Sequence, residues 1–407
     1  MKSVKLASIL FYLNSVFVVF CFVSCGSSPT EASSLLTADI RGGMDKPGLL
    51  GLGDEIKGVT FVPLEVTTDD ASLIDGVYDY AVTDRYIYVL PVKEPRIVLF
   101  DRQGRFIRTL VKEGQGPGEF RGILPCIQVD ERNDRLFLFS NNRVWEYTLE
   151  GEFIGQSTHE YSVIYMRHIG KDRFAAISFP FQPFNGGGFG LGLFSRKGDT
   201  IAIKNDFYSF LLPHEKSGFT TSIAPAYSDA QNSVLFKTGS NDTVFCISAD
   251  RISAACVLDL KNSDAEVIRS LDVTVMSNLR IEKKDPKDIF VQDMIEFPGH
   301  YYFRLLYNQG YYIASVDKKT GKTLVEKCVM PGSIYELADA NLQHGMQGTR
   351  SYRNFPVWGR VIKDELVQVV TPYELNLYKS LRSITIPQEL DLKGEEGNPV
   401  FVFYSLI

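Results

Sequence analysis

The chain has 407 residues, of which 44% are hydrophobic and 23% are charged, values that are typical of a globular protein and exclude a disordered one. Its formal net charge is −6, and no basic stripe runs along it, so nucleic acid is not an expected partner. The length would allow two or three domains, but a ring of repeated units can use a whole chain as one domain.

Residues 1–24 have the pattern of a secretory signal peptide, in which a basic start precedes an apolar run and small residues at the cleavage point. The sequence Val-Ser-Cys-Gly at 23–26 resembles the lipobox of bacterial lipoproteins, where cleavage leaves a lipid-modified cysteine as the first mature residue. We therefore predict that Cys25 is a lipid anchor, and that the exported protein is held in the cell envelope, on the periplasmic side of the outer membrane. A transmembrane anchor is the alternative, because the apolar run approaches the roughly 20 residues that span a bilayer.

Residues 25–55 follow the predicted cleavage point and are rich in Ser, Gly and short polar residues, with no sustained hydrophobic period. Such a composition predicts a flexible tether. The folded domain is expected to cover residues 56–407.

Six times along this domain an apolar run, a short polar stretch and a second run of mostly β-branched or aromatic residues follow one another. These copies lie at residues 80–90, 126–139, 166–177, 226–237, 294–305 and 359–370. Each pattern predicts two strands joined by a turn. Short strands repeating every 40 to 70 residues or so are typical of a β-propeller, in which each unit buries its faces against its neighbours.

Five of the six units continue into a second hairpin and so contain four strands each. The turn glycines Gly104, Gly151 and Gly198 stand 47 residues apart. The sixth unit has no second hairpin directly after it, but residues 399–406 and 58–66 both alternate as strands. We predict an all-β, six-bladed β-propeller whose last blade is closed by the N- and C-terminal strands, which would leave no open edge in the ring.

Three segments carry a resemblance to a known family: GQGPGEF at 114–120, LFLFSNNRVWEY at 136–147 and GNPVFVFYSLI at 397–407. With them the chain resembles the NHL-like six-bladed β-propeller lipoproteins of Gram-negative bacteria, which have the TolB-like propeller architecture. The resemblance covers the chain from about residue 56 onward. It implies the fold and export, and because most of those proteins have no assigned activity, it implies no specific function.

The GQGPGEF segment is the first candidate for ligand binding. Its glycines alternate with polar residues, so backbone amides around Gln115 would be accessible and Glu119 could point into the central channel. The alternative is that the glycines only allow a tight crossing between two blades.

Long loops between strands two and three, and between blades, are expected on one face of the ring, which is where binding residues usually gather on a rigid scaffold. Phe181 and Phe184 lie in such a loop beside three glycines, and they could contact a sugar or a partner, or pack onto the rim. Arg350, in the loop before the last blade, completes the candidate binding residues.

Two of the internal cysteines, Cys246 and Cys256, flank one predicted hairpin. A turn at 248–251 sets Cys246 opposite Ser253, so the two sulfurs stand about three residues, or roughly 10 Å, out of register. The sequence therefore predicts buried free thiols rather than a disulfide.

Two functions remain open from the sequence. The favoured one is a binding or scaffolding lipoprotein whose long-loop face holds a partner protein, a peptide or an envelope glycan, with no cofactor, metal or catalytic residue. The alternative is a lactonase-like or lyase-like propeller enzyme that uses calcium in its channel. A calcium site needs about six oxygen ligands, and the predicted inner strands offer Asp293 and few other acids.

Overall fold

The computed structural model describes residues 35–48, 55–68, 70–121, 126–140, 142–159, 163, 165–177, 191–204, 226–230, 232–237, 242–261, 289–307, 310–328, 360–380 and 397–407. The described residues from 36 onward fold together as one unit. Among the described residues, no helix is long and apolar enough to cross a membrane. The predicted signal peptide and Cys25 lie outside the described residues.

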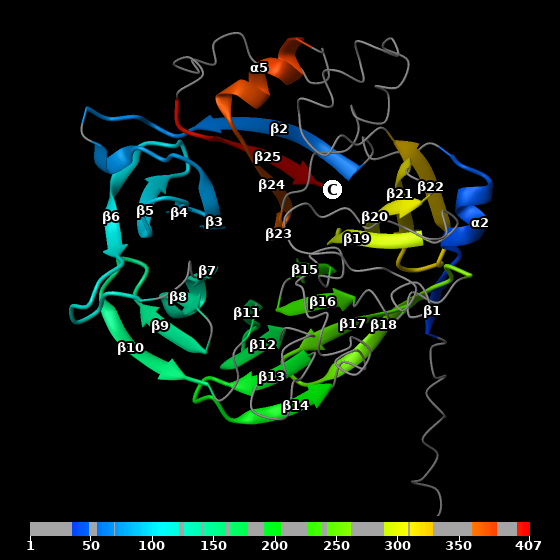
Figure 1. The fold of residues 1–407 in the computed structure, drawn as a ribbon, viewed down its shortest axis with the longest axis horizontal. Helices are drawn as coiled ribbons and strands as arrows, with labels where there is room; N and C mark the ends of the chain where they lie inside the picture. The colour runs from blue at the N-terminus through cyan, green and yellow to red at the C-terminus, as the bar shows by residue number, and fades with distance from the viewer. Residues whose placement is uncertain are drawn as a thin grey trace, which may run out of the picture. The chain divides into compact units, whose positions relative to one another are not determined.

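Six sheets are arranged around a common centre, which confirms the predicted six-bladed β-propeller (Figure 1). Blades one and two consist of β3 (Val77–Val82), β4 (Tyr86–Pro91), β5 (Arg96–Asp101) and β6 (Phe106–Lys112), then β7 (Cys126–Asp130), β8 (Arg135–Ser140), β9 (Arg143–Tyr147) and β10 (Phe153–Thr158). Blades three and four consist of β11 (Tyr165–His168), β12 (Arg173–Ile177), β13 (Leu191–Ser195) and β14 (Thr200–Lys204), then β15 (Ala226–Ala230), β16 (Ser233–Lys237), β17 (Thr243–Ser248) and β18 (Ile252–Leu258). Blade five consists of β19 (Ile289–Glu296), β20 (His300–Tyr307), β21 (Gly310–Asp317) and β22 (Thr323–Cys328).

Blade six joins the two ends of the domain, as the sequence predicted. Its strand order is β2-β25-β24-β23, with antiparallel pairing throughout. The strands are β23 (Arg360–Ile362), β24 (Glu365–Val370), β25 (Val400–Leu406) and β2 (Ile56–Pro63). The C-terminal strand β25 thus lies between β24 and the N-terminal strand β2, and the ring is closed by hydrogen bonds.

The hydrophobic core lies between blades rather than within them. The described buried side chains form five main clusters, and each cluster combines residues of two neighbouring blades. In the cluster between blades one and two, for example, Tyr88 of β4 and Trp145 of β9 are almost completely buried. Each blade is therefore stabilised by the blades beside it, as expected for a repeat architecture.

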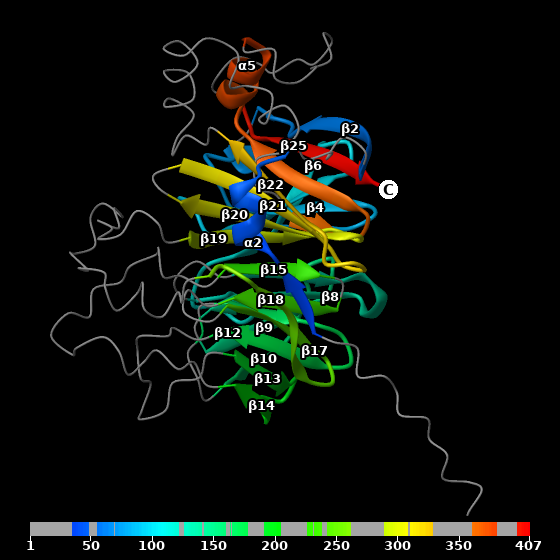
Figure 2. The ribbon, with the colours of Figure 1, turned by 90° about the vertical axis from the view of Figure 1, so that its right-hand side faces the viewer.

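The N-terminal segment differs from the predicted tether. Leu36–Ala38 forms β1, which pairs in parallel with β18 and adds a fifth strand to blade four. The helix α2 (Ile40–Asp45) follows, with Asp39 as its N-cap, and lies against β22 of blade five (Figure 2). Ala38 and Ile40 are fully buried. Residues 36–48, named the N-terminal arm below, are therefore part of the folded unit.

One more helix, α5 (Pro372–Ser380), is inserted between β24 and β25 of blade six. Two short 3-10 turns, at Asp70–Ser72 and Glu131–Asn133, complete the described regular structure.

Candidate functional site

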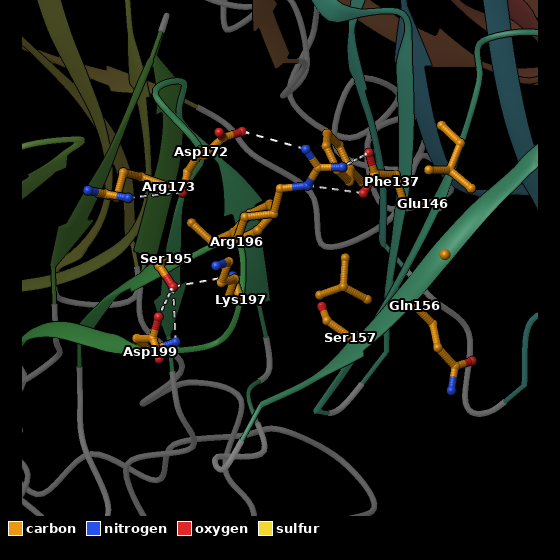
Figure 3. A pocket seen from close by; sticks show the side chains of 14 residues that line it. Phe137, Glu146, Gln156, Ser157, Asp172, Arg173, Ser195, Arg196, Lys197 and Asp199 are labelled. Atoms are coloured by element: carbon orange, nitrogen blue, oxygen red, sulfur yellow. Dashed lines mark hydrogen bonds and ion pairs between the residues drawn. The ribbon is translucent and has the colours of Figure 1, made fainter.

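A cavity of about 640 Å³ opens between blades two and three (Figure 3). We name it the 2/3 wedge. It is lined by Phe137, Val144, Glu146, Ile154, Gly155, Gln156, Ser157, Asp172, Arg173, Phe174, Ser195, Arg196, Lys197 and Asp199. One wall comes from β8, β9 and β10 of blade two. The other wall comes from blade three: from β12, from the turn before β12, and from the end of β13 with the turn that follows it.

Strand register explains why these side chains share one wall. On blade two, Gly155 lies opposite Glu146 and Ser157 lies opposite Val144, so all four stand on the face that looks toward blade three. The outer strand carries the small residues Gly155 and Ser157 on this face, and they line the cavity. The floor of the wedge is apolar because Phe137 of blade two is buried beneath it, within the same hydrophobic cluster that fills this junction.

A shared carboxylate stands at the centre of the wedge. Glu146, whose side chain is 12% exposed, lies between two guanidinium groups. Arg196 of blade three donates from Nε to Oε2 at 3.2 Å and from Nη2 to Oε1, while Arg135 Nε lies 2.6 Å from Oε1. The hydrogen bond with Glu146 raises the pKa of Arg196. Glu146 thus pairs with two arginines, one from each of the two blades.

The outer rim of the wedge adds further charged groups. Asp172, which is largely exposed, lies 3.8 Å from Arg196 Nη1. Asp199 is held within its own turn, because its carboxylate accepts a hydrogen bond from Ser195 Oγ at 2.9 Å. The ammonium group of exposed Lys197 has no partner in the part of the chain that the structure describes. The wedge can thus offer positive charge to an incoming acidic group, and Figure 3 shows Arg196 reaching from blade three toward Glu146 above this turn.

The GQGPGEF segment closes on itself. Exposed Gln115 lies in its turn, and Glu119 accepts a hydrogen bond from the Gly116 N–H at 2.7 Å. A Cβ placed on Gly114 would stand 1.9 Å from Glu119 Oε2, so the carboxylate lies directly over the glycines. Phe120 is fully buried beside the core of blade two. The Glu119 side chain therefore faces its own loop rather than the channel, which supports the alternative of a tight crossing between blades.

The other candidate binding residues, Phe181, Phe184 and Arg350, lie outside the described residues. The structure instead brings together Glu146, Arg196 and their neighbours, which the sequence did not single out. No short motif could have found them, since they come from two blades and stand 50 positions apart.

Acids on the inner strands are held by arginines. Asp79 of β3, which the sequence analysis missed, accepts from Arg360 Nη1 at 2.5 Å and from the Ile127 N–H at 2.6 Å. Asp293 of β19 lies 3.4 Å from Arg304. Burial raises the pKa of both carboxyl groups, and the arginines oppose that rise. Among the described residues, no three His, Cys, Asp or Glu side chains stand close enough together to hold a metal ion.

The cysteines on β17 and β18 follow the predicted register. Cys246 lies opposite Ser253, and Cys256 lies opposite Val244. Both thiols are free, as predicted. Burial raises the pKa of Cys256 to about 12, so this thiol stays protonated and unreactive at neutral pH.

Comparison with known proteins gives the family and the fold. A family model described as a domain of unknown function (DUF4934) matches residues 35–405. No curated protein matches the chain. A crystal structure of a Bacteroides fragilis protein, named only for its suggested export, superposes with a TM-score of 0.63 at 14% identity, over 91% of this chain and 99% of that one.

Two further solved structures are similar over smaller parts of the chain. The WD40 β-propeller domain of Doa1 gives a TM-score of 0.35 at 13% identity, over 68% of this chain and 75% of that one. A chain of the nidogen/laminin complex gives a TM-score of 0.33 at 10% identity, over 66% of this chain and 93% of that one.

Proposed function

The chain belongs to the family of that matching model, a domain of unknown function (DUF4934), and we propose that it is an exported, lipid-anchored β-propeller that binds or scaffolds a partner in the cell envelope. The observation that carries this proposal is the 2/3 wedge. It is a concave site with an apolar floor and a few convergent charged groups, set in a scaffold of hydrogen-bonded sheets. Such a site recognises a partner without requiring chemistry.

The long-loop face belongs to the same proposal as a second contact surface. Phe181, Phe184 and Arg350 would contact a partner protein, a peptide or an envelope glycan there. Gln115, which is exposed and lies in the described part of the chain, would add a further contact. Aromatic side chains near glycines suit this purpose, because they provide contact area with few rotatable bonds.

The lipid anchor would place the protein at the periplasmic side of the outer membrane. The lipobox at 23–26 and the resemblance to NHL-like propeller lipoproteins support this proposal. The shared fold with a bacterial protein of suggested export is in keeping with it. In the producing cell, Cys25→Ser should move the protein from the membrane fraction to the soluble periplasmic fraction. Unchanged fractionation with an uncleaved N-terminus would reject the anchor.

Capture from an envelope extract tests the binding function. Immobilised protein beginning at residue 26 should retain a specific envelope protein or glycan, and blocking one of the two surfaces should release it. Gly155→Trp blocks the 2/3 wedge, and Phe181→Ala with Phe184→Ala removes the aromatic groups of the long loop. Failure to retain any component would count against the function, as would turnover of a lactone or uronic-acid polysaccharide that a chelator abolishes and calcium restores.

A further inference from the structure

A second wedge in the same molecule is already filled by polypeptide. Between blades four and five, β1 pairs with residues 256–258, and the side chains of Ala38, Ile40 and Met44 enter the hydrophobic cluster of that junction. The N-terminal arm therefore occupies the space between the two blades, where its apolar side chains replace solvent.

The inner strands of the two wedge walls correspond in position. In blade two Phe137 pairs with Glu146, and in blade four Leu235 pairs with Cys246. Glu146 and Cys246 each lie two residues before the turn that joins strands three and four. The wall that is apolar in the filled wedge thus carries a carboxylate in the open one.

The opposite walls correspond as well. The Arg196 N–H donates to the Asp172 carbonyl at 3.0 Å, and the Lys318 N–H donates to the Gly299 carbonyl at 2.9 Å in the same place of blade five. Lys197 therefore corresponds to Lys319, the next residue of the blade-five turn. Both turns therefore carry two basic residues, and at the filled junction Lys318 is paired with Glu296 at 2.5 Å.

Apolar side chains flank the 2/3 wedge on the outer strands. Ile154 of β10 is exposed, and so are Ile201 and Ile203 of β14. Outer strands usually carry charged residues at such positions, which discourage contact with other chains. Exposed apolar groups around a charged centre mark a surface for a macromolecular partner.

We propose that the 2/3 wedge receives a peptide segment of a partner protein, with an acidic side chain inserted toward Arg196 and Lys197 and apolar side chains on Ile154. This inference rests on the proposed binding function and names the class of partner. Two observations support it: the corresponding wedge is filled by polypeptide, and the exposed ammonium group of Lys197 has no partner among the described residues, so that an added acid can pair with it.

The probe is a short peptide with the sequence of residues 36–40, Leu-Thr-Ala-Asp-Ile. In the N-terminal arm its apolar side chains fill the corresponding wedge while exposed Asp39 caps α2, and in the free peptide that carboxylate is available to Lys197. It would be labelled with fluorescein at its N-terminus, amidated at its C-terminus, and compared with versions that carry Asn or Lys in place of Asp. Fluorescence anisotropy should show binding of the Asp peptide at least about tenfold tighter than that of the Lys peptide.

Two variants have matched controls. Gly155→Trp should abolish binding because an added Cβ meets open space and the ring then fills the wedge, and its control is Gly58→Trp, at the corresponding position of β2. Lys197→Glu should weaken binding of the Asp peptide about tenfold, whereas Lys319→Glu, the same change in the blade-five turn, should leave it unchanged. Melting temperatures near that of the parent confirm that the variants fold.

The inference is overturned if the Asp and Lys peptides bind alike, if neither binds, or if Gly155→Trp leaves binding intact. It is also overturned if binding responds to Lys319→Glu, because the peptide would then be displacing the N-terminal arm. If no peptide binds, but the protein still captures a component of the envelope extract and Gly155→Trp does not reduce that capture, only the peptide inference is rejected. When both fail, the binding function falls with it.

Discussion

At the scale of single residues, the regular spacing of the turn glycines has a structural cause. Gly104 has a φ of +82°, and a Cβ there would stand 2.2 Å from the Pro63 carbonyl oxygen at the end of β2. The corresponding glycines of blades two, three and five also have positive φ and approach the outer strand of the preceding blade. The glycine therefore serves both the turn and the contact between blades.

Gly104→Ala should lower the free energy of unfolding by about 2–4 kcal/mol, because the left-handed backbone and the close carbonyl both oppose a side chain. Gly299→Ala is the control, since that turn glycine has open space around it and no positive φ. Urea unfolding of both variants measures the difference. Equal stabilities would show that the blade contact tolerates a methyl group.

His159 makes folding sensitive to acid. It is 2% exposed, packs edge-on against Phe174 and Phe194, and neither ring nitrogen has a hydrogen-bond partner among the described residues. Burial lowers the pKa of His159 below its ordinary value of about 6.5. Below about pH 6.5, His159 is protonated in the unfolded chain but stays neutral in the folded protein. The contribution of His159 to the free energy of unfolding is therefore fully present above about pH 6.5 and is lost as the pH falls toward the folded pKa.

His159→Phe should therefore reduce the loss of stability between about pH 7 and pH 5, by at most about 1.4 kcal/mol for each pH unit. Some loss should remain, because burial also lowers the pKa of His168. Melting temperatures measured across this range give the slope. A slope unchanged by the substitution would assign the acid sensitivity to other groups.

At the scale of elements, the N-terminal arm is the clearest departure from the sequence prediction. Its Ser- and Gly-rich surroundings predict a tether, yet Leu36, Ala38 and Ile40 alternate along the chain, Met44 follows one helical turn later, and all four enter the junction of blades four and five. Composition averaged over 30 residues hides a segment this short. Alternation of apolar residues alone could not identify the arm, because the space between blades four and five that receives it exists only in the folded structure.

Ala38→Asp should destabilise the protein by about 3–5 kcal/mol, because it places an unpaired charge where no side-chain surface is exposed. Thr37→Asp is the matched control, since the neighbouring side chain on β1 points to solvent. Denaturant unfolding distinguishes the two. If both variants unfold at the parent's midpoint, the arm is not part of the cooperative unit.

The blade strands could be predicted from sequence, whereas the 2/3 wedge could not. Alternating runs and turn glycines are local signals, and they located the hairpins and the register that sets Cys246 opposite Ser253. The wedge depends on how the faces of two sheets meet, and Glu146 and Arg196 are ordinary strand and turn residues until the blades pack. Glu119 is the opposite case. Its sequence motif made it a candidate binding residue, but its carboxylate accepts a hydrogen bond within its own loop.

At the scale of the whole molecule, closure of the ring is expected to make unfolding cooperative. The core clusters each belong to two blades, so opening one junction exposes apolar surface on both sides of it. Blade six carries the closure, since β25 pairs with β24 on one side and β2 on the other. Val400 and Phe401, the first two residues of β25, are fully buried.

Deletion of residues 400–407 should therefore abolish the folded ring rather than trim it. The deletion leaves β24 and β2 with open edges and removes the side chains that fill the junction with blade one, so the protein should aggregate or lose its melting transition.

Phe401→Ala tests the same strand by a single substitution and should lower the free energy of unfolding by about 3–5 kcal/mol, because it leaves a cavity in the cluster between blades six and one. Val59→Ala on the exposed side of β2 is its control, with an expected change below about 0.5 kcal/mol. Calorimetry and size-exclusion chromatography measure both effects, and a truncated protein that melts like its parent would show that the ring does not depend on its terminal strand.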